Sequence, residues 1–149
     1  MNIAFRFFLL AALLLGAVRL TAADSMDMKN DMKGEVLSAY LKVSSALAAD
    51  DLAAAKSAAA TLAEHARTGG KRDIADKADA LAKASKIEAA RGAFKTLSVA
   101  VEPLAMGDKA YIVMYCPMAD SDWIQTSAKV QNPYFGKAML TCGGPKKAK

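Results

Sequence analysis

The sequence predicts a mainly α protein: an antiparallel up-and-down bundle of about four helices, followed by a small C-terminal β-hairpin and loop module. Residues 34–106 are rich in alanine and repeat their apolar side chains at helical spacing. After Gly107 the apolar repeat changes to a period of two, which is typical of strands. Short connections between helices of similar length favour antiparallel neighbours. The chain has 149 residues, so we expect one domain in which residues 107–149 pack on the bundle.

Residues 1–23 have the pattern of a secretory signal peptide. A basic start is followed by an apolar run from Phe7 to Val18 and then by small residues up to Ala23. This run is shorter than the roughly 20 residues that a membrane span requires. We therefore expect a periplasmic, exported protein with no membrane span after cleavage of the signal.

Residues 24–33 form a polar segment with three methionines, Met26, Met28 and Met32. A segment with so few other apolar residues is expected to be flexible. Thioethers are soft ligands for monovalent copper or silver, so these methionines are candidate accessory ligands. The alternative is a linker in which the methionines bind nothing.

Four helices are expected within residues 34–106. The first three are predicted at residues 34–49, 52–68 and 72–84. Gly69 and Gly70 provide the stop after the second helix, because glycine readily adopts the left-handed conformation found at helix ends. The fourth helix is expected to begin at a capping box formed by Ser85 and Glu88, and Pro103 and Gly107 are expected to close it.

The C-terminal module is predicted from its β-branched and aromatic residues. Residues 111–116 favour a strand, residues 123–126 a returning strand, and residues 135–140 a helical turn. Alternation along the first strand places Cys116 on one face, and an extended Pro117 would add Met118 to that face. Met139 and Cys142 are three residues apart and can share a face of the turn.

These residues supply a possible soft-metal site of four sulfur atoms, from Cys116, Met118, Met139 and Cys142. Two thiolates and two thioethers suit Cu(I) or Ag(I) and suit magnesium or calcium poorly. The alternative is a Cys116–Cys142 disulfide in a structural or protein-interaction module without metal, as is usual for exported proteins with paired cysteines. Both remain open, since a disulfide can be the oxidised form of a dithiol site.

The remaining motifs argue against an enzyme and against nucleic-acid binding. The net charge is +5, but basic and acidic residues are interspersed along the chain and form no basic stripe of the kind that binds nucleic acid. The one histidine, His65, is predicted on the solvated face of the second helix, and the usual blue-copper and catalytic zinc sites need more histidines. No glycine-rich phosphate loop or nucleophile elbow is present.

The C-terminal motif resembles an exported bacterial domain of unknown function that is associated with heavy-metal binding. Its members occur alone or fused to the periplasmic adaptor subunits of Cus-type copper and silver efflux pumps. The motif consists of Tyr115-Cys116-Pro117-Met118-Ala119, Trp123, Asn132-Pro133-Tyr134-Phe135-Gly136, Met139-Leu140 and Cys142-Gly143. The resemblance continues upstream at Tyr40-Leu41, Leu47, Asp50-Asp51, Lys86-Ile87, Arg91 and Phe94.

The resemblance implies a helix-rich periplasmic domain that binds Cu(I) or Ag(I), with an efflux adaptor as its possible partner. It carries the ligand role to Cys116, Met118, Met139 and Cys142. Two departures bear on the ligand set. The loop before Trp123 is shorter than in relatives, and Ala90 and Ala93 stand where many relatives have histidines. Both departures favour a site made of sulfur alone.

Overall fold

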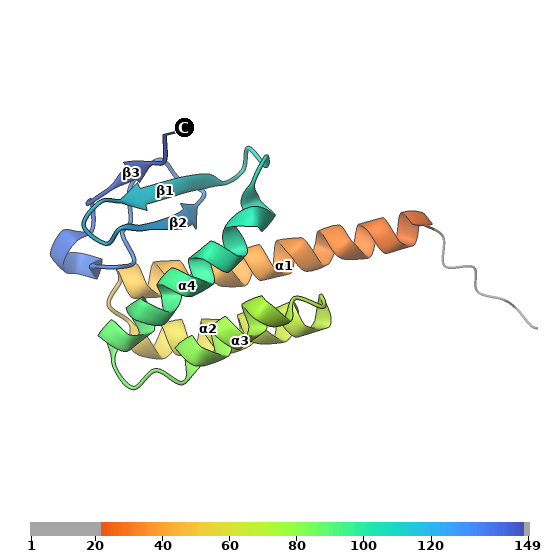
Figure 1. Cartoon of the computed structure of the whole chain (residues 1–149), viewed down its shortest axis with the longest axis horizontal. Helices are drawn as coiled ribbons and strands as arrows, with labels where there is room; N and C mark the ends of the chain where they lie inside the picture. Colours follow the sequence, from red (N-terminus) through yellow and green to blue (C-terminus); the bar gives the residue numbers. More distant parts are fainter. Residues whose placement is uncertain (1–21, 148–149) are drawn as a thin grey trace, which may run out of the picture.

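A computed structural model of the chain describes residues 22–147, with side chains from residue 30 onward (Figure 1). Four helices come first: α1 (Ala22–Ala48), α2 (Leu52–Thr68), α3 (Arg72–Ala82) and α4 (Ile87–Ala105). They are followed by β1 (Ile112–Cys116), β2 (Ser121–Gln125), the 3-10 helix η1 (Gly136–Met139) and β3 (Gly144–Pro145). The predicted fold class, a mainly α bundle with a small C-terminal β module, is therefore confirmed. Residues 1–21, which hold most of the predicted signal peptide, lie outside the described part.

Helix α1 begins earlier than the sequence predicts. The structure includes residues 24–33 in the helix, where we expected a flexible segment. Methionine, lysine and alanine are good helix formers, and residues 22–33 contain no proline or glycine. Of the three candidate accessory methionines, only Met32 has a described side chain. It is half-buried, and its methyl carbon lies beside Gly69 just after α2.

The bundle core combines small and large side chains. Consecutive helices lie side by side and run in opposite directions, as the up-and-down prediction requires (Figure 1). The buried residues of α2 are mostly alanine, and most of the larger buried side chains of the bundle come from α1 and α4, among them Leu37, Tyr40, Leu47, Phe94, Leu97 and Val101. No helix in residues 22–147 contains a stretch long and apolar enough to cross a membrane.

The start of α4 differs from the prediction. We expected Ser85 and Glu88 to form a capping box, but the N-cap residue is Lys86 and no side chain caps the first turn. The box fails because the helix begins one residue later than a Ser85 cap requires. At its other end the helix continues through Pro103 to Ala105.

The three strands form an antiparallel sheet in the order β2-β1-β3. Met114 of β1 lies opposite Trp123 of β2, which confirms the predicted hairpin, although its turn occupies residues 117–120. Strand β3 was not predicted, because Gly144 and Pro145 are poor strand formers. Its pairing depends on where the chain returns to β1, which local sequence preference does not specify.

Aromatic side chains join the sheet to the bundle. The rings of Tyr40 and Phe94 stack with their centroids 5.1 Å apart, and the Tyr134 ring lies 5.8 Å from that of Phe94. Trp123 meets Tyr134 edge-on at 6.0 Å. The hydroxyl of Tyr40 also accepts a hydrogen bond of 3.2 Å from the backbone N–H of Ile124 in β2. Stacked and edge-on pairs each add about 0.5–1.5 kcal/mol beyond simple burial, so this column is a main connection between the two layers.

A polar clamp fastens the loop before η1 to the helices. Arg91 of α4 donates hydrogen bonds of 3.1 Å to the carbonyl oxygens of Pro133 and Leu47, and it pairs with the carboxylate of Asp50. The second carboxylate oxygen of Asp50 accepts a bond of 3.2 Å from the backbone N–H of Lys137. One arginine and one aspartate thus connect the end of α1, the start of α4 and the C-terminal module.

Removal of the Asp50 charge is expected to destabilise the protein in a pH-dependent way. The hydrogen bond from Arg91 lowers the pKa of Asp50, and the N–H of Lys137 acts in the same direction. Because the folded pKa is below the ordinary value of about 3.9, the stabilisation is fully present above that value and is lost as the pH falls through the folded pKa. Asp50→Asn should therefore lower the thermal midpoint at neutral pH, and the difference from the native protein should disappear in acid.

The matched control for this measurement is Asp76→Asn, on the exposed side of α3. Thermal unfolding of the three proteins is compared from neutral to strongly acid pH. If the difference between Asp50→Asn and the native protein stays constant as the pH falls, the ion pair is not its cause.

Candidate functional site

Two cysteine sulfurs meet at the end of the central strand. Cys116 is the last residue of β1, and Cys142 lies two residues before β3. Because β3 returns antiparallel beside β1, with Gly144 opposite Tyr115, the two cysteines are brought together although they are 26 positions apart. Their Sγ atoms are 3.5 Å apart, and both residues are free thiols. The structure therefore joins two of the four predicted ligands.

Gly143 allows the chain to pass this close to the sheet. Its φ angle is +108°, in the region that favours glycine. A Cβ atom at this position would lie 2.7 Å from the carbonyl oxygen of Tyr115 and 2.9 Å from the ring of Trp123. The absence of a side chain here lets Cys142 reach the end of β1.

Asn132 is fully buried beside the thiol pair. Its side-chain amide donates a bond of 2.7 Å to the carbonyl oxygen of Cys142, and the same amide helps to lower the pKa of the Cys116 thiol. Its Oδ1 accepts bonds from the backbone N–H groups of Tyr134 (2.8 Å) and Phe135 (3.3 Å). Because those two donors need the oxygen, the NH2 group of the amide must face the cysteines.

The surroundings favour one thiolate in the pair. Burial raises the pKa of the Cys116 thiol, but hydrogen bonds from the N–H of Ala119, the amide of Asn132 and the thiol of Cys142 together bring the pKa below its usual value. The hydrogen bond to Cys116 raises the pKa of Cys142. The first proton is therefore lost more easily from Cys116, and the resulting thiolate is held by the Cys142 thiol and by N–H groups.

The two predicted methionine ligands lie in different surroundings. We expected Met118 to share the buried face of Cys116, but the chain turns at Pro117 and the Met118 side chain is 64% exposed. Met139 ends η1 and is half-buried, and its carbonyl oxygen accepts a bond of 3.0 Å from the N–H of Cys142. Their role as ligands stays a prediction.

An open groove with a volume of about 1490 Å³ lies beside the thiol pair. Its walls come from the end of α4, from β1 and from the C-terminal segment, and they include Met106, Tyr115, Met118, Cys142 and Pro145. Cys142 is half-exposed on this wall, whereas Cys116 is completely buried. A molecule in the groove would therefore meet the sulfur of Cys142 first.

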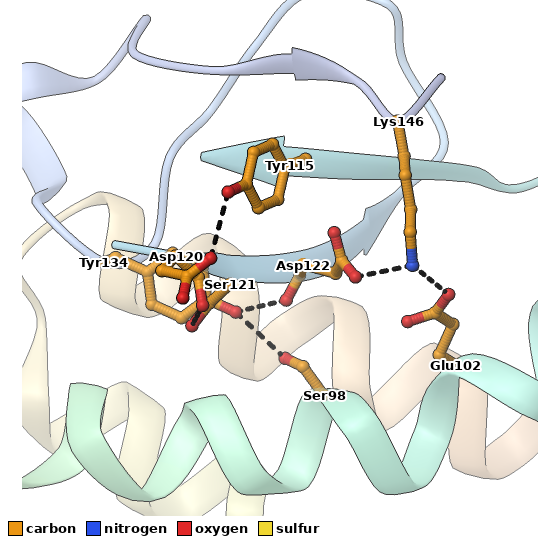
Figure 2. A network of polar contacts seen from close by, with 8 residues as sticks. All are labelled: Ser98, Glu102, Tyr115, Asp120, Ser121, Asp122, Tyr134 and Lys146. Carbon is orange, nitrogen blue, oxygen red and sulfur yellow. Dashed lines mark hydrogen bonds and ion pairs between the residues drawn. The ribbon is translucent and has the colours of Figure 1, made fainter. Parts of the chain in front are cut away.

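An ion-pair network fixes the segment that follows Cys142. Figure 2 shows the Nζ atom of Lys146 between two carboxylates, 2.6 Å from Oδ2 of Asp122 and 2.9 Å from Oε1 of Glu102. The hydroxyl of Tyr134 donates to the carbonyl oxygen of Asp122 and lies 3.5 Å from Oγ of Ser98 (Figure 2). The C-terminal segment is thus held to β2 and, through Glu102, to α4.

Harder metal ligands are not assembled in the described part of the chain. Within residues 22–147, no group of three or more histidine, cysteine, aspartate or glutamate side chains is placed to hold a metal ion. The histidine, His65, is half-exposed and lies 3.1 Å from a carboxylate oxygen of Glu35. An ion at the thiol pair would have to complete its coordination with thioethers, water or an external ligand.

Comparison with known proteins assigns the bundle to a family. A family model described as a protein of unknown function, DUF3347, matches residues 36–111, about half of the chain. The chain belongs to the DUF3347 family. The DUF3347 match runs from α1 to the residue before β1, so both cysteines lie beyond it. No curated protein and no solved structure matched the chain.

The DUF3347 assignment agrees with the resemblance to a domain of unknown function. Export, metal binding and a link to efflux adaptors stay predictions. The DUF3347 region supplies both side chains of the polar clamp, Asp50 and Arg91, which hold the loop that carries Asn132. The role of Asn132 was not predicted from the sequence, although an Asn-Pro pair that opens a turn is a recognised signal for an asparagine side chain that bonds to the nearby backbone.

Proposed function

We propose that this protein binds a monovalent soft cation, Cu(I) or Ag(I), through the thiols of Cys116 and Cys142. The observation that carries the proposal is the 3.5 Å separation of the two Sγ atoms. A metal–thiolate bond is about 2.3 Å long for zinc, so two sulfurs up to about 4.6 Å apart can bind one ion of similar size. The hydrogen bonds that favour a Cys116 thiolate support the same proposal, because the thiolate is the form that binds metal.

The choice of a soft ion rests on the donors near the pair. Thiolates and thioethers select Cu(I) over hard cations such as Mg²⁺ and Ca²⁺. Met118 lines the same groove as Cys142, and we propose Met118 and Met139 as the further sulfur donors. We propose Met26, Met28 and Met32 as possible accessory ligands.

We further propose that the protein is exported to the periplasm and acts in metal resistance by binding rather than by catalysis. The export proposal rests on the leader pattern of residues 1–23. Transfer of the metal to an efflux adaptor rests on the sequence resemblance described above.

The proposal is tested by anaerobic titration of the reduced protein against a Cu(I) chelator of known affinity. We expect one tightly bound Cu(I) per chain, and a loss of affinity of at least tenfold in both Cys116→Ser and Cys142→Ser. Met118→Leu and Met139→Leu should have smaller effects. Met106→Leu is the matched control, because Met106 is 68% exposed on the same groove. Unchanged affinity in the two cysteine variants would refute the proposal.

The second candidate function is a disulfide-stabilised structural or protein-interaction module without metal. The same short sulfur separation favours it, since a small movement would bring the thiols to bonding distance. A disulfide would join the end of β1 to the segment before β3. This candidate predicts an intact mass two hydrogens lower under oxidising conditions, resistance of the bond to mild reductant, and no effect of added metal.

A further inference from the structure

We infer that Cys116 and Cys142 form a reversible thiol–disulfide exchange pair in which every mixed disulfide is made on Cys142. The substrates we propose are small or peptide thiols and their disulfides, bound in the adjacent groove. This activity does not depend on metal binding, because it uses the two cysteines in the absence of any ion.

The first argument is the difference in access to the two sulfurs. Cys142 is half-exposed on the wall of the groove, and Cys116 has no exposed surface. Thiol–disulfide exchange requires the attacking sulfur to approach the disulfide along a free path, so access determines which sulfur is attacked. An incoming thiolate can therefore reach Cys142 and is kept from Cys116.

The second argument is the short distance between the two sulfurs. The Sγ atoms of Cys116 and Cys142 are 3.5 Å apart, and both residues are free thiols. The buried Cys116 is therefore placed to attack Cys142 when a mixed disulfide must be resolved, and to depart when the disulfide is attacked at Cys142.

The reaction balances in both directions. From the reduced protein, Cys142 loses its proton and attacks a small disulfide as the thiolate, and the S–S bond of that disulfide breaks and releases one thiolate. Cys116 then attacks Sγ of Cys142, the mixed disulfide breaks, and the second small thiolate leaves. Two cysteine thiols are oxidised to one disulfide, one small disulfide is reduced to two thiols, and two protons pass from the cysteines to the products. The reverse reaction oxidises two small thiols at the expense of the protein disulfide.

The groove is large enough for such a substrate. Its volume of about 1490 Å³ exceeds that of a typical small-molecule pocket, roughly 300–1000 Å³, and can hold a short peptide. Met118 and Tyr115 provide apolar surface near Cys142. The ion pairs of Lys146 keep the segment after Cys142 in place while its sulfur reacts.

The test uses reduced, metal-free protein with oxidised glutathione in the presence of a chelator. We expect the native protein to form the Cys116–Cys142 disulfide and to release two glutathione molecules per chain. Cys116→Ser should stop as a stable glutathione adduct on Cys142. Cys142→Ser should form its adduct at least tenfold more slowly, because its remaining sulfur is buried. Early acid quenching and peptide mapping of the native protein should find the first adduct on Cys142. This measurement needs no variant, so the inference can be tested even if a cysteine variant does not fold.

Three results would overturn the inference. The first is an adduct on Cys116 that forms as fast as the one on Cys142. The second is a first adduct on Cys116 in the native protein. The third is a disulfide that stays fully oxidised at every ratio of reduced to oxidised glutathione, which would make it purely structural. The Cu(I) titration is done on reduced protein and measures a different property. A negative result in the glutathione experiment would therefore not change the conclusion on metal binding.

Discussion

Replacing Gly136 with alanine is expected to lower the free energy of unfolding by roughly 3 kcal/mol. Gly136 has a φ angle of +56°, which costs a residue with a Cβ about 1 kcal/mol or more. The added Cβ would also overlap Oδ1 of Asp50 and the guanidinium of Arg91, and it would lie 2.8 Å from Cγ of Asp50. The variant can relieve this overlap only by separating the polar clamp that holds the loop to α1 and α4.

Chemical denaturation of Gly136→Ala beside Gly92→Ala measures this effect. Gly92 lies in α4, and a Cβ there would have no neighbour within 4 Å. The control should therefore gain about 0.5–1 kcal/mol, because alanine is the better helix former. Equal stability of the two variants would show that the clamp has no role in stabilising the fold.

Asn132→Ala is expected to have an effect of similar size, about 3 kcal/mol or more. The truncation leaves the N–H groups of Tyr134 and Phe135 and the carbonyl oxygen of Cys142 without their side-chain partner. Asn132 is completely buried, so water does not readily replace these bonds. We also expect slower exchange with glutathione, since the carbonyl oxygen of Cys142 loses the donor that helps to hold Cys142 beside Cys116.

The conservative variant Asn132→Asp separates the two roles of this residue. An ionised aspartate keeps acceptors for the two backbone N–H groups but has no donor for Cys142 or Cys116. Its carboxylate also disfavours a thiolate nearby. If Asn132 positions the thiol pair, this variant should exchange slowly under conditions in which it is folded. Native exchange rates in a folded Asn132→Asp protein would limit the residue to a structural role.

Local pattern was sufficient to predict the bundle and the hairpin. The helical repeat of apolar residues, Gly69-Gly70 and the change to a period of two after Gly107 each reflect the preferences of neighbouring residues. The errors occurred where the local signal was weak. Residues 24–33 lie in α1, where we expected no helix. The capping box at Ser85 does not form, because α4 begins after Lys86.

The site was only partly predictable for a related reason. The pairing of Cys116 with Cys142 was expected because the chain has two cysteines, but their approach depends on β3, whose two residues carry no strand signal. Met118 was placed on the buried face by strand alternation, and the turn at Pro117 removed it from that face. The bond of Asn132 to Cys142 and the clamp of Asp50 with Arg91 join segments that are separated in the sequence, so no local pattern could predict them.

The measurement that tests the central claim most directly is X-ray absorption at the copper edge of the reduced protein loaded with one equivalent of Cu(I). If Cys116 and Cys142 hold the ion, the first coordination shell should consist of sulfur, with bonds near those of a metal–thiolate pair, and the signal should be lost in the variant that lacks both cysteines. A first shell made mainly of nitrogen or oxygen, or an unchanged spectrum without the cysteines, would contradict the account.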